Sequence, residues 1–466
     1  MQSRLHDRLS RIVPVLLAAT LFVATGCSSS NYSNQSSAAS GSAFVIGTDA
    51  PMAAITSFLV TVNSITLTDA NGHTASLLSS AQQIDFARYN GLQTLLAVNK
   101  IPSGSYTSAT ISLGSGTIGY LQTSTTGPPT IETHAADMTQ TTVTVSLSQP
   151  LVITQSGPPA GLRVELNLAK SIQVDSTGQI TFQVNPVFTV KGVAPGDSDA
   201  HIDELVGSVV SVDAGAQSFV LQGPHGMQFT VDVTSKTDWE GNVGLGTLGV
   251  GNIVKVSGDL GSTIQTINAD DVTLLSAHGF YASGQVTYVE PASGKATSFD
   301  LYVRDVLPAN TAVKLGTIAP VNLTGNEKFY ISWMNNPMTQ FLFNSSAMVP
   351  GQAVSIGGPV SGATNPATVN RVVLRHWGFV GTVVPGSVNS SMDSFQMQVN
   401  GFAGVLIPET ITVYMTGETE FRDGFMGMTD ITDNAKVRVV GLLLRDTTSG
   451  KVILLAHYTD DMGKDN

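Results

Sequence analysis

Charged residues, cysteine and aromatic residues are all scarce in this chain of 466 residues. Charged side chains make up 12% of it, about half of the ~25% usual in soluble proteins, whereas 42% is hydrophobic, which excludes a disordered chain. A single cysteine excludes an internal disulfide framework. The formal net charge of −12 argues against nucleic acid or anionic lipid as a partner. What remains is rich in Ser, Thr, Gly and Val, which is typical of an extracytoplasmic β protein.

The N-terminal segment has the pattern of a secretory signal peptide. Three arginines precede an apolar run over residues 12–25, and this run is shorter than the ~20 residues of a membrane-spanning helix. The run leads directly into Gly26 and Cys27, and small residues before a cysteine resemble the lipobox of bacterial lipoproteins. The resemblance implies cleavage between Gly26 and Cys27 and acylation of the Cys27 thiol. The alternative is an ordinary signal peptide with a free cysteine nearby.

Acylation at Cys27 would hold the mature chain on a membrane, since each buried methylene of an acyl chain adds ~0.8 kcal/mol. Ser28 follows the cysteine, and its resemblance to enteric sorting signals implies the outer membrane of a bacterial envelope. Removal of residues 1–26 takes away three Arg and one Asp, which changes the net charge from −12 to −14. Residues 27–42 are rich in serine and uncharged, which predicts a flexible tether.

Runs of β-branched residues with a period of two dominate the chain from residue 43 onward. Such runs lie at residues 58–62, 65–67, 142–147 and 180–184. Half-buried strands with one face in water explain this alternation. One helix is expected over residues 86–98, where Leu92, Leu95 and Leu96 lie on one side. Because Gly and Pro interrupt the remaining sequence, residues 43–193 predict an antiparallel β-sandwich.

A series of short motifs runs through this predicted sandwich. They are Gly47-Thr48-Asp49-Ala50-Pro51, Val60-Thr61-Val62-Asn63-Ser64-Ile65, Ile84-Asp85-Phe86, Leu95-Leu96-Ala97, Ile101-Pro102-Ser103-Gly104-Ser105-Tyr106, Leu168-Ala169-Lys170-Ser171-Ile172 and Asn185-Pro186-Val187-Phe188. Their order resembles DUF4382, a family of uncharacterised bacterial lipoprotein domains. Asn167 stands where an Asp of that family is expected. The resemblance implies no activity for this segment.

Beyond an acidic linker at residues 194–204, the chain contains three similar units. Each unit has a Gly-x-Val element ahead of a strand with a phenylalanine at Phe219, Phe299 or Phe395. Each then has a strand of the type V-x-V-x-G, at residues 254–258, 354–358 and 437–441. A closing apolar strand completes every copy. The predicted units are residues 205–275, 279–375 and 377–458.

Five or six short strands per unit predict a small closed β-barrel, because closure removes exposed strand edges. The units resemble the DUF5666 family, whose repeated domains occur on similar lipoproteins, and the resemblance implies barrels similar to the OB fold. A two-sheet sandwich for each unit stays open. The expected fold class is therefore all-β: an N-terminal antiparallel β-sandwich followed by three small OB-like β-barrel modules.

The densest acidic cluster lies in the linker, around His201. Asp197, Asp199 and Asp203 are candidate metal ligands there, and Ca²⁺ is the cation that prefers several oxygen ligands on a flexible loop. The glycine and the terminal glutamate of an EF-hand loop are absent. A hydrated linker without a metal is the competing interpretation. The acidic pairs at residues 270–271 and 460–461 are expected to be solvated strand ends.

Three other residues are candidates for ligand contact. Asp49 could bind a ligand or could form a turn in which its carboxylate caps backbone amides. Trp333 and Trp377 have no counterparts in all three units, so they are better candidates for surface stacking than the recurring aromatic residues. Aromatic residues that recur inside apolar strands favour core packing instead.

The sequence shows no catalytic constellation and predicts no cofactor. Residues 114–119 match the GxGxxG spacing, but a β-rich stretch on both sides favours strand curvature over a nucleotide site. There is no GxSxG or SxxK motif, and no two histidines lie within four residues of each other. An acylated Cys27 would leave no thiolate for zinc binding or nucleophilic catalysis.

The expectation is a non-enzymatic protein, anchored in the cell envelope through lipid, that binds or scaffolds an envelope protein or glycan. Repeated modules suit this role because linked weak contacts raise the effective concentration. One alternative is an envelope enzyme acting on polysaccharide, or its accessory subunit, which would require a concave pocket with two carboxylates about 5–10 Å apart. Another alternative is a carrier of a small apolar ligand inside a barrel.

Overall fold

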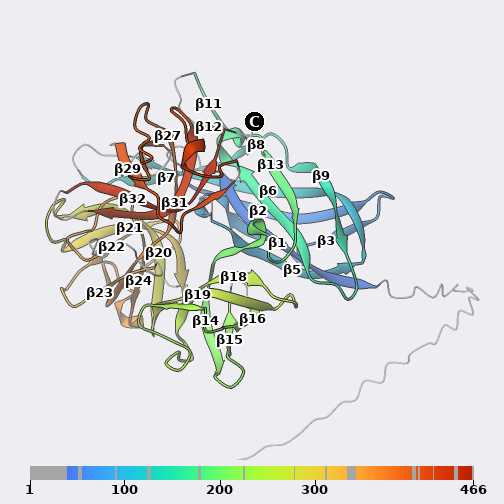
Figure 1. The fold of residues 1–466 in the computed structure, drawn as a ribbon, viewed down its shortest axis with the longest axis horizontal. Helices are drawn as coiled ribbons and strands as arrows, with labels where there is room; N and C mark the ends of the chain where they lie inside the picture. Colours follow the sequence, from blue (N-terminus) through green and yellow to red (C-terminus); the bar gives the residue numbers. More distant parts are fainter. Residues whose placement is uncertain are drawn as a thin grey trace, which may run out of the picture. The chain divides into compact units, whose positions relative to one another are not determined.

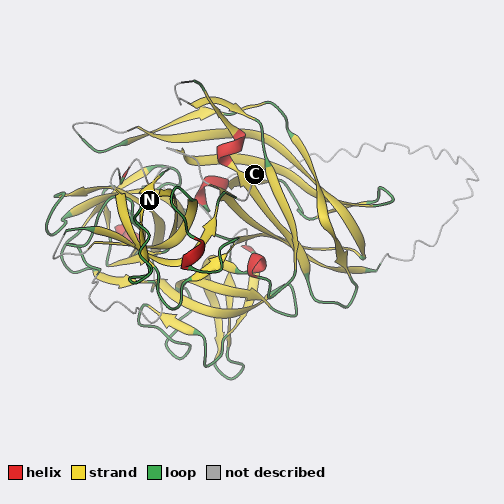
Figure 2. Ribbon diagram, turned by 45° about the horizontal axis from the view of Figure 1, so that its top comes forward, coloured by secondary structure: helices red, strands yellow, loops and turns green. Residues whose placement is uncertain are grey.

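The computed structural model describes residues 39–463 except for short gaps at residues 51–54, 90–91, 123–126, 177–179, 224–225, 278, 310–311, 333–342, 401–405, 408–409, 423 and 446–449. The predicted signal peptide, Gly26 and Cys27 lie outside the described residues. The all-β prediction is confirmed, since strands dominate and one four-residue α-helix, α1 (Leu168–Ser171), stands among them in the described part (Figure 2). No helix in this part is both long and apolar enough to cross a membrane.

The first module is a sandwich of two sheets over residues 40–193. One sheet has the order β13-β10-β1-β5, with β1 (Ser40–Ala50), β5 (Thr94–Pro102), β10 (Ala160–Asn167) and β13 (Phe188–Val193). The other is built on β2 (Ile55–Asp69) and β6 (Gly104–Gln122), with β3 (Thr74–Ser76), β4 (Gln82–Asp85), β7 (Thr130–Ala135) and β9 (Thr142–Ile153). A small third sheet contains β8 (Asp137–Met138), β11 (Ile172–Val174) and β12 (Ile180–Val184).

The sandwich differs from the sequence expectation in three places. Strands β1 and β10 pair in parallel, so the module is not purely antiparallel. Strand β1 begins at Ser40 and therefore includes the last residues of the predicted tether. The predicted helix over residues 86–98 is wrong: a 3₁₀ turn, Phe86–Arg88, is followed by strand β5.

The first barrel follows directly and consists of β14 (Ile202–Asp213), β15 (Ser218–Gln222), β16 (Gln228–Asp232), β17 (Asp238–Glu240), β18 (Ile253–Leu260) and β19 (Thr266–Ser276). Its strand order is β16-β15-β14-β18-β19, and a parallel pairing of β16 with β19 closes it. This closure with one parallel pair is the OB-like arrangement expected from the sequence. Strand β17 pairs in parallel with residues 271–273 of β19.

The second and third barrels repeat this connectivity, and each is a continuous stretch of chain (yellow to orange and red in Figure 1). The second has β20 (Phe280–Glu290), β21 (Ser298–Leu307), β22 (Ile318–Asn322), β23 (Lys328–Ile331), β24 (Ala353–Gly358), β25 (Ala367–Thr368) and β26 (Arg371–Arg375). The third has β27 (Trp377–Val383), β28 (Ser394–Val399), β29 (Thr410–Tyr414), β30 (Glu420–Arg422), β31 (Lys436–Arg445) and β32 (Val452–Asp461). A β29–β32 pairing closes the third barrel, whereas in the second two short strands stand for the last one: β25 pairs in parallel with β22, and β26 pairs with β24.

The recurring residues hold equivalent places in the three barrels. Phe219, Phe299 and Phe395 lie in β15, β21 and β28, and each is 1% exposed, as core packing requires. Gly284 of β20 leaves no room for a side chain, because a Cβ there would lie 1.7 Å from the carbonyl oxygen of Tyr302. The recurring glycine thus permits the first two strands of the barrel to approach each other.

Candidate binding site

A cavity of about 550 Å³ lies where the sandwich, the linker and the three barrels meet. The sandwich contributes Leu92, and the segment that leads into β14 contributes Gly196, Asp197, Ser198, His201, Asp203 and Glu204. The first barrel contributes Glu240, Lys255, Ser257, Asp259, Asp270 and Asp271. The second contributes Ser332, Arg375 and His376 near its end, and the third contributes Glu418, Glu420, Arg422, Val440, His457 and Tyr458. We call this space the junction cavity.

Negative charge dominates the walls of the junction cavity. Nine carboxylates and three lysine or arginine side chains line it. Each of the three cationic side chains forms an ion pair with one carboxylate: Lys255 with Asp271 at 2.8 Å, Arg375 with Glu204 at 2.6 Å and Arg422 with Glu420 at 2.6 Å. Among the described residues, the other six carboxylates have no lysine or arginine within 4.0 Å. The cavity therefore favours cations over anions.

Two buried carboxyl groups share one hydroxyl group in the first-barrel wall. Thr273 Oγ1 lies 2.9 Å from Glu240 Oε2 and 3.1 Å from Asp271 Oδ1. Since a hydroxyl has one proton to donate, only one of the two carboxylates can receive it. Lys255 Nζ forms an ion pair with Asp271, so Glu240 is the more readily protonated of the two carboxyl groups.

The pKa shifts agree with this geometry. Burial, followed by repulsion from Asp271, raises the pKa of Glu240 to about 7. Burial alone would lower the pKa of Lys255, but the charges of Asp271 and Glu240 outweigh it and raise that pKa. This wall therefore places a lysine and a glutamate whose pKa values are both raised beside Asp271.

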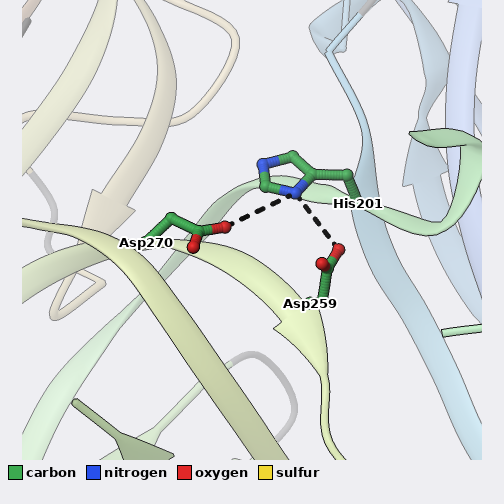
Figure 3. Close-up of side chains that lie close together, drawn as sticks. All are labelled: His201, Asp259 and Asp270. Carbon is green, nitrogen blue, oxygen red and sulfur yellow. Dashed lines mark hydrogen bonds and ion pairs between the residues drawn. The ribbon is translucent and has the colours of Figure 1, made fainter. Parts of the chain in front are cut away.

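A second group, at the end of the same barrel, surrounds His201 (Figure 3). The ring atom Nδ1 lies 3.2 Å from Asp259 Oδ1 and 4.0 Å from Asp270 Oδ2, and Nε2 lies 3.1 Å from Ser257 Oγ. Burial lowers the pKa of His201, but the hydrogen bond with Asp259 and the nearby carboxylates outweigh it, so the pKa is raised. Within the described chain these three residues are the group whose donor atoms approach closely enough for a metal ion, all within 4.8 Å.

The third-barrel wall contains aromatic side chains. The rings of His376 and His457 stack with centroids 4.9 Å apart, and the guanidinium of Arg422 lies 3.8 Å from the ring centroid of Tyr458. Burial lowers the pKa of His376 well below its usual value and lowers that of His457 as well. These two imidazoles are neutral at physiological pH and offer flat surfaces to a ligand.

Comparison with known proteins assigns part of the chain. Residues 41–186 match the family described as a domain of unknown function, DUF4382. The match runs from β1 to the segment before β13, so it covers the sandwich except for β13 and confirms the resemblance seen in its motifs. No curated protein matches the chain. The matched segment supplies Leu92 to the lining of the cavity, and the description of the family names no activity.

The structure does not bring the predicted calcium ligands together. Asp197 Oδ2 accepts the backbone N–H of Ala194, Asp199 forms an ion pair with Arg163, and Asp203 Oδ2 accepts the N–H of Gln93. The linker turns through a short 3₁₀ helix, Ser198–Ala200, which directs these side chains toward different neighbours. Each carboxylate has a different partner, and the three are not among the described residues whose donor atoms lie close enough together for a metal ion. The group of close donor atoms is formed instead by His201, Asp259 and Asp270.

The other predicted contact residues are not brought together either. Asp49 lies in β1, where its backbone is opposite Leu166, so it is not a turn residue, and its side chain is outside the described part. Trp333 falls in the gap at residues 333–342. Trp377 is 8% exposed and packs against the guanidinium of Arg304 at 4.9 Å, so it is not a surface residue.

Two residues expected to be solvated are in fact buried. Asp271 is 7% exposed and Asp460 is 2% exposed, because each pairs with a cation on the neighbouring strand. Asp460 accepts from Arg438 Nε at 2.6 Å. A basic residue inside two of the three V-x-V-x-G motifs, Lys255 and Arg438, was the available signal for these pairs.

Proposed function

We propose that this protein is a lipid-anchored protein of the bacterial cell envelope that binds a small polar ligand in the junction cavity. The observation that supports it is the cavity itself, whose lining comes from the DUF4382 domain and all three barrels. Side chains from four modules converge there, and a pocket of a few hundred Å³ is the usual size for a small-molecule site. Ligand binding would then also stabilise the arrangement of the modules.

The ligand-binding proposal is tested by native mass spectrometry of the protein extracted from its own membranes. Ser198 is exposed and lines the cavity, so Ser198→Trp should fill the space without disturbing the core. We expect a bound small molecule on the wild-type protein and none on this variant. Ser235→Trp, in an exposed turn of the first barrel away from the cavity, should keep the ligand. A wild-type protein that is free of ligand under all extraction conditions contradicts the proposal.

The lipid anchor is proposed from the small residues before Cys27 and the serine-rich segment after it. Replacement of the thiol in Cys27→Ser removes the acylation site, so the variant should incorporate no labelled fatty acid and should leave the membrane fraction. Labelling with radioactive palmitate followed by membrane fractionation measures both effects. Labelling that persists in the variant would show that the anchor lies elsewhere.

We also propose, from the recurring motifs, that the three barrels are related to the DUF5666 family. Ser28 after the cysteine supports the proposal that the anchor lies in the outer membrane.

An enzyme acting on envelope polysaccharide is a second candidate. The observation that favours it is the pair Glu240 and Asp271, two carboxyl groups held by one hydroxyl group in the wall of a cavity. A carboxyl group with a pKa of about 7 can act as a general acid at neutral pH. Release of new reducing ends from envelope polysaccharide would distinguish this enzyme from a binding protein, which leaves the polysaccharide intact.

A further inference from the structure

We propose that the junction cavity holds a divalent transition-metal ion, such as Zn²⁺ or Mn²⁺, bound by His201 Nδ1 and one carboxylate oxygen each of Asp259 and Asp270. The site goes beyond the proposed ligand binding and does not depend on it. It stands on two observations, which are the convergence of three donor atoms and the uncompensated negative charge around them.

The donor atoms come from three separate segments of the first barrel and its linker. His201 precedes β14, Asp259 lies near the end of β18, and Asp270 lies on the antiparallel neighbour β19. Figure 3 shows both carboxylates directed at the same edge of the imidazole ring. All three donor atoms lie within 4.8 Å of one another, and a small inward shift of these side chains would bring them to the ~2.0–2.2 Å ligand distances of one ion. A hydrogen bond at the opposite ring nitrogen fixes the orientation of a metal-binding histidine, and Ser257 Oγ occupies that position at 3.1 Å.

The second observation is a buried carboxylate next to this group. Asp271 follows Asp270 in β19, lines the same cavity and is 7% exposed. Lys255 and Thr273 contact its Oδ1, whereas Oδ2 has no hydrogen-bond partner among the described residues. A buried oxygen left without a donor costs free energy unless a cation or a proton compensates for it. Lys255 balances the charge of Asp271, so a divalent ion at the neighbouring group would offset the excess charge of the lining carboxylates that have no lysine or arginine partner.

The donor set also indicates which metal ions fit. One imidazole nitrogen and two carboxylate oxygens suit zinc or manganese, and three protein ligands leave further coordination positions for water or a ligand. Ca²⁺ prefers six to eight oxygen ligands, so an imidazole and two aspartates favour it less. The competing explanation is a protonated His201 held by two carboxylates without any metal, which the experiment must exclude.

The experiment is isothermal titration of Zn²⁺ into the full mature protein in detergent, after removal of metals with a chelator. We expect one equivalent to bind, and we expect His201→Asn and Asp270→Asn each to weaken binding about tenfold or more. Asp270 has a side chain that is 67% exposed, so its variant leaves the fold intact. Glu418→Gln removes one charge from the same cavity at an exposed position and should bind as the wild type does.

A second measurement reports the ligands directly. Co²⁺ bound in place of Zn²⁺ should give a visible absorption spectrum that changes in His201→Asn and remains in Glu418→Gln. The proposal is overturned if the wild-type protein binds no Zn²⁺ below ~1 mM, or if the two ligand variants bind Zn²⁺ as tightly as the wild type. It is equally overturned if Glu418→Gln weakens binding as much as they do, since that result indicates diffuse attraction to a negative cavity. Mn²⁺ and Ca²⁺, titrated separately, should both bind in the wild type with Ca²⁺ the weaker.

Discussion

Replacing Arg438 by methionine is expected to lower the free energy of unfolding by about 3–5 kcal/mol, the usual cost of leaving a buried charge without its partner. Arg438 lies in β31 with 4% of its side chain exposed and donates to Asp460 Oδ2 at 2.6 Å. Asp460 is itself 2% exposed. Glu165 of the DUF4382 domain lies 4.0 Å from the same guanidinium, so the variant also weakens the attachment of the third barrel.

Urea unfolding of three variants separates lost charge pairing from lost packing. Arg445→Met changes a partly exposed arginine at the end of the same strand, and its effect should stay within about 0.5 kcal/mol. The double variant Arg438→Met with Asp460→Leu removes both charges and should recover most of the loss, because apolar replacements of buried ion pairs are often neutral or stabilising. A double variant as unstable as Arg438→Met alone would mean that packing, not the unpaired carboxylate, determines the effect.

The architecture of the barrels could be predicted because their signals are local. A strand of the type V-x-V-x-G places two apolar residues on one face and a glycine at a close approach, whatever surrounds the barrel. The same motif misleads about its second residue. Lys255, Ser355 and Arg438 occupy this position in the three barrels, and alternation predicts that they face water. All three are buried, with 7%, 0% and 4% exposed, because neighbouring modules cover that face.

The error at residues 86–98 has the same physical origin. Leu96 belongs to the core between the two sheets of the DUF4382 domain, whereas Leu95 belongs to the core of the first barrel. Phe44 of the adjacent strand β1 also packs in the first-barrel core. A strand that is covered on both faces has no polar alternation, and its consecutive leucines resemble a helix face. Sequence patterns describe one module at a time, so they could not show where modules cover one another.

The candidate site was missed for this reason. The junction cavity exists only where four modules meet, and its residues come from positions as distant as Leu92 and Tyr458. Glu240 ends the three-residue strand β17 and Asp271 belongs to an acidic pair within β19, and neither carries a catalytic or ligand-binding motif. Of the acidic cluster predicted around His201, the histidine, Asp197 and Asp203 line the cavity, whereas Asp199 does not. The actual neighbours of His201 are about 60 residues further along the chain, on strands that no local spacing could pair with it.

The substitution Glu240→Gln should stabilise the protein at pH 8 and have little effect near pH 4.5. The folded state raises the pKa of Glu240 from 4.5 to about 7, mainly through burial and next through repulsion from Asp271. The native state therefore binds this proton more tightly than the unfolded chain does, so stability falls as the pH rises from about 4.5 to about 7 and then stays constant.

A glutamine at position 240 keeps an oxygen to accept the hydrogen bond of Thr273 and removes the charge. The expected gain at pH 8 approaches about 3 kcal/mol, from 1.36 kcal/mol for each pKa unit. Urea unfolding at pH 4.5 and pH 8 measures it, with Glu418→Gln, an exposed glutamate of the same cavity, as the matched control that should gain almost nothing. Equal gains for Glu240→Gln at both pH values would rule out a titrating Glu240. A gain confined to high pH would instead show that the protein maintains an unfavourable buried carboxylate in this cavity, as is common where a site serves function rather than stability.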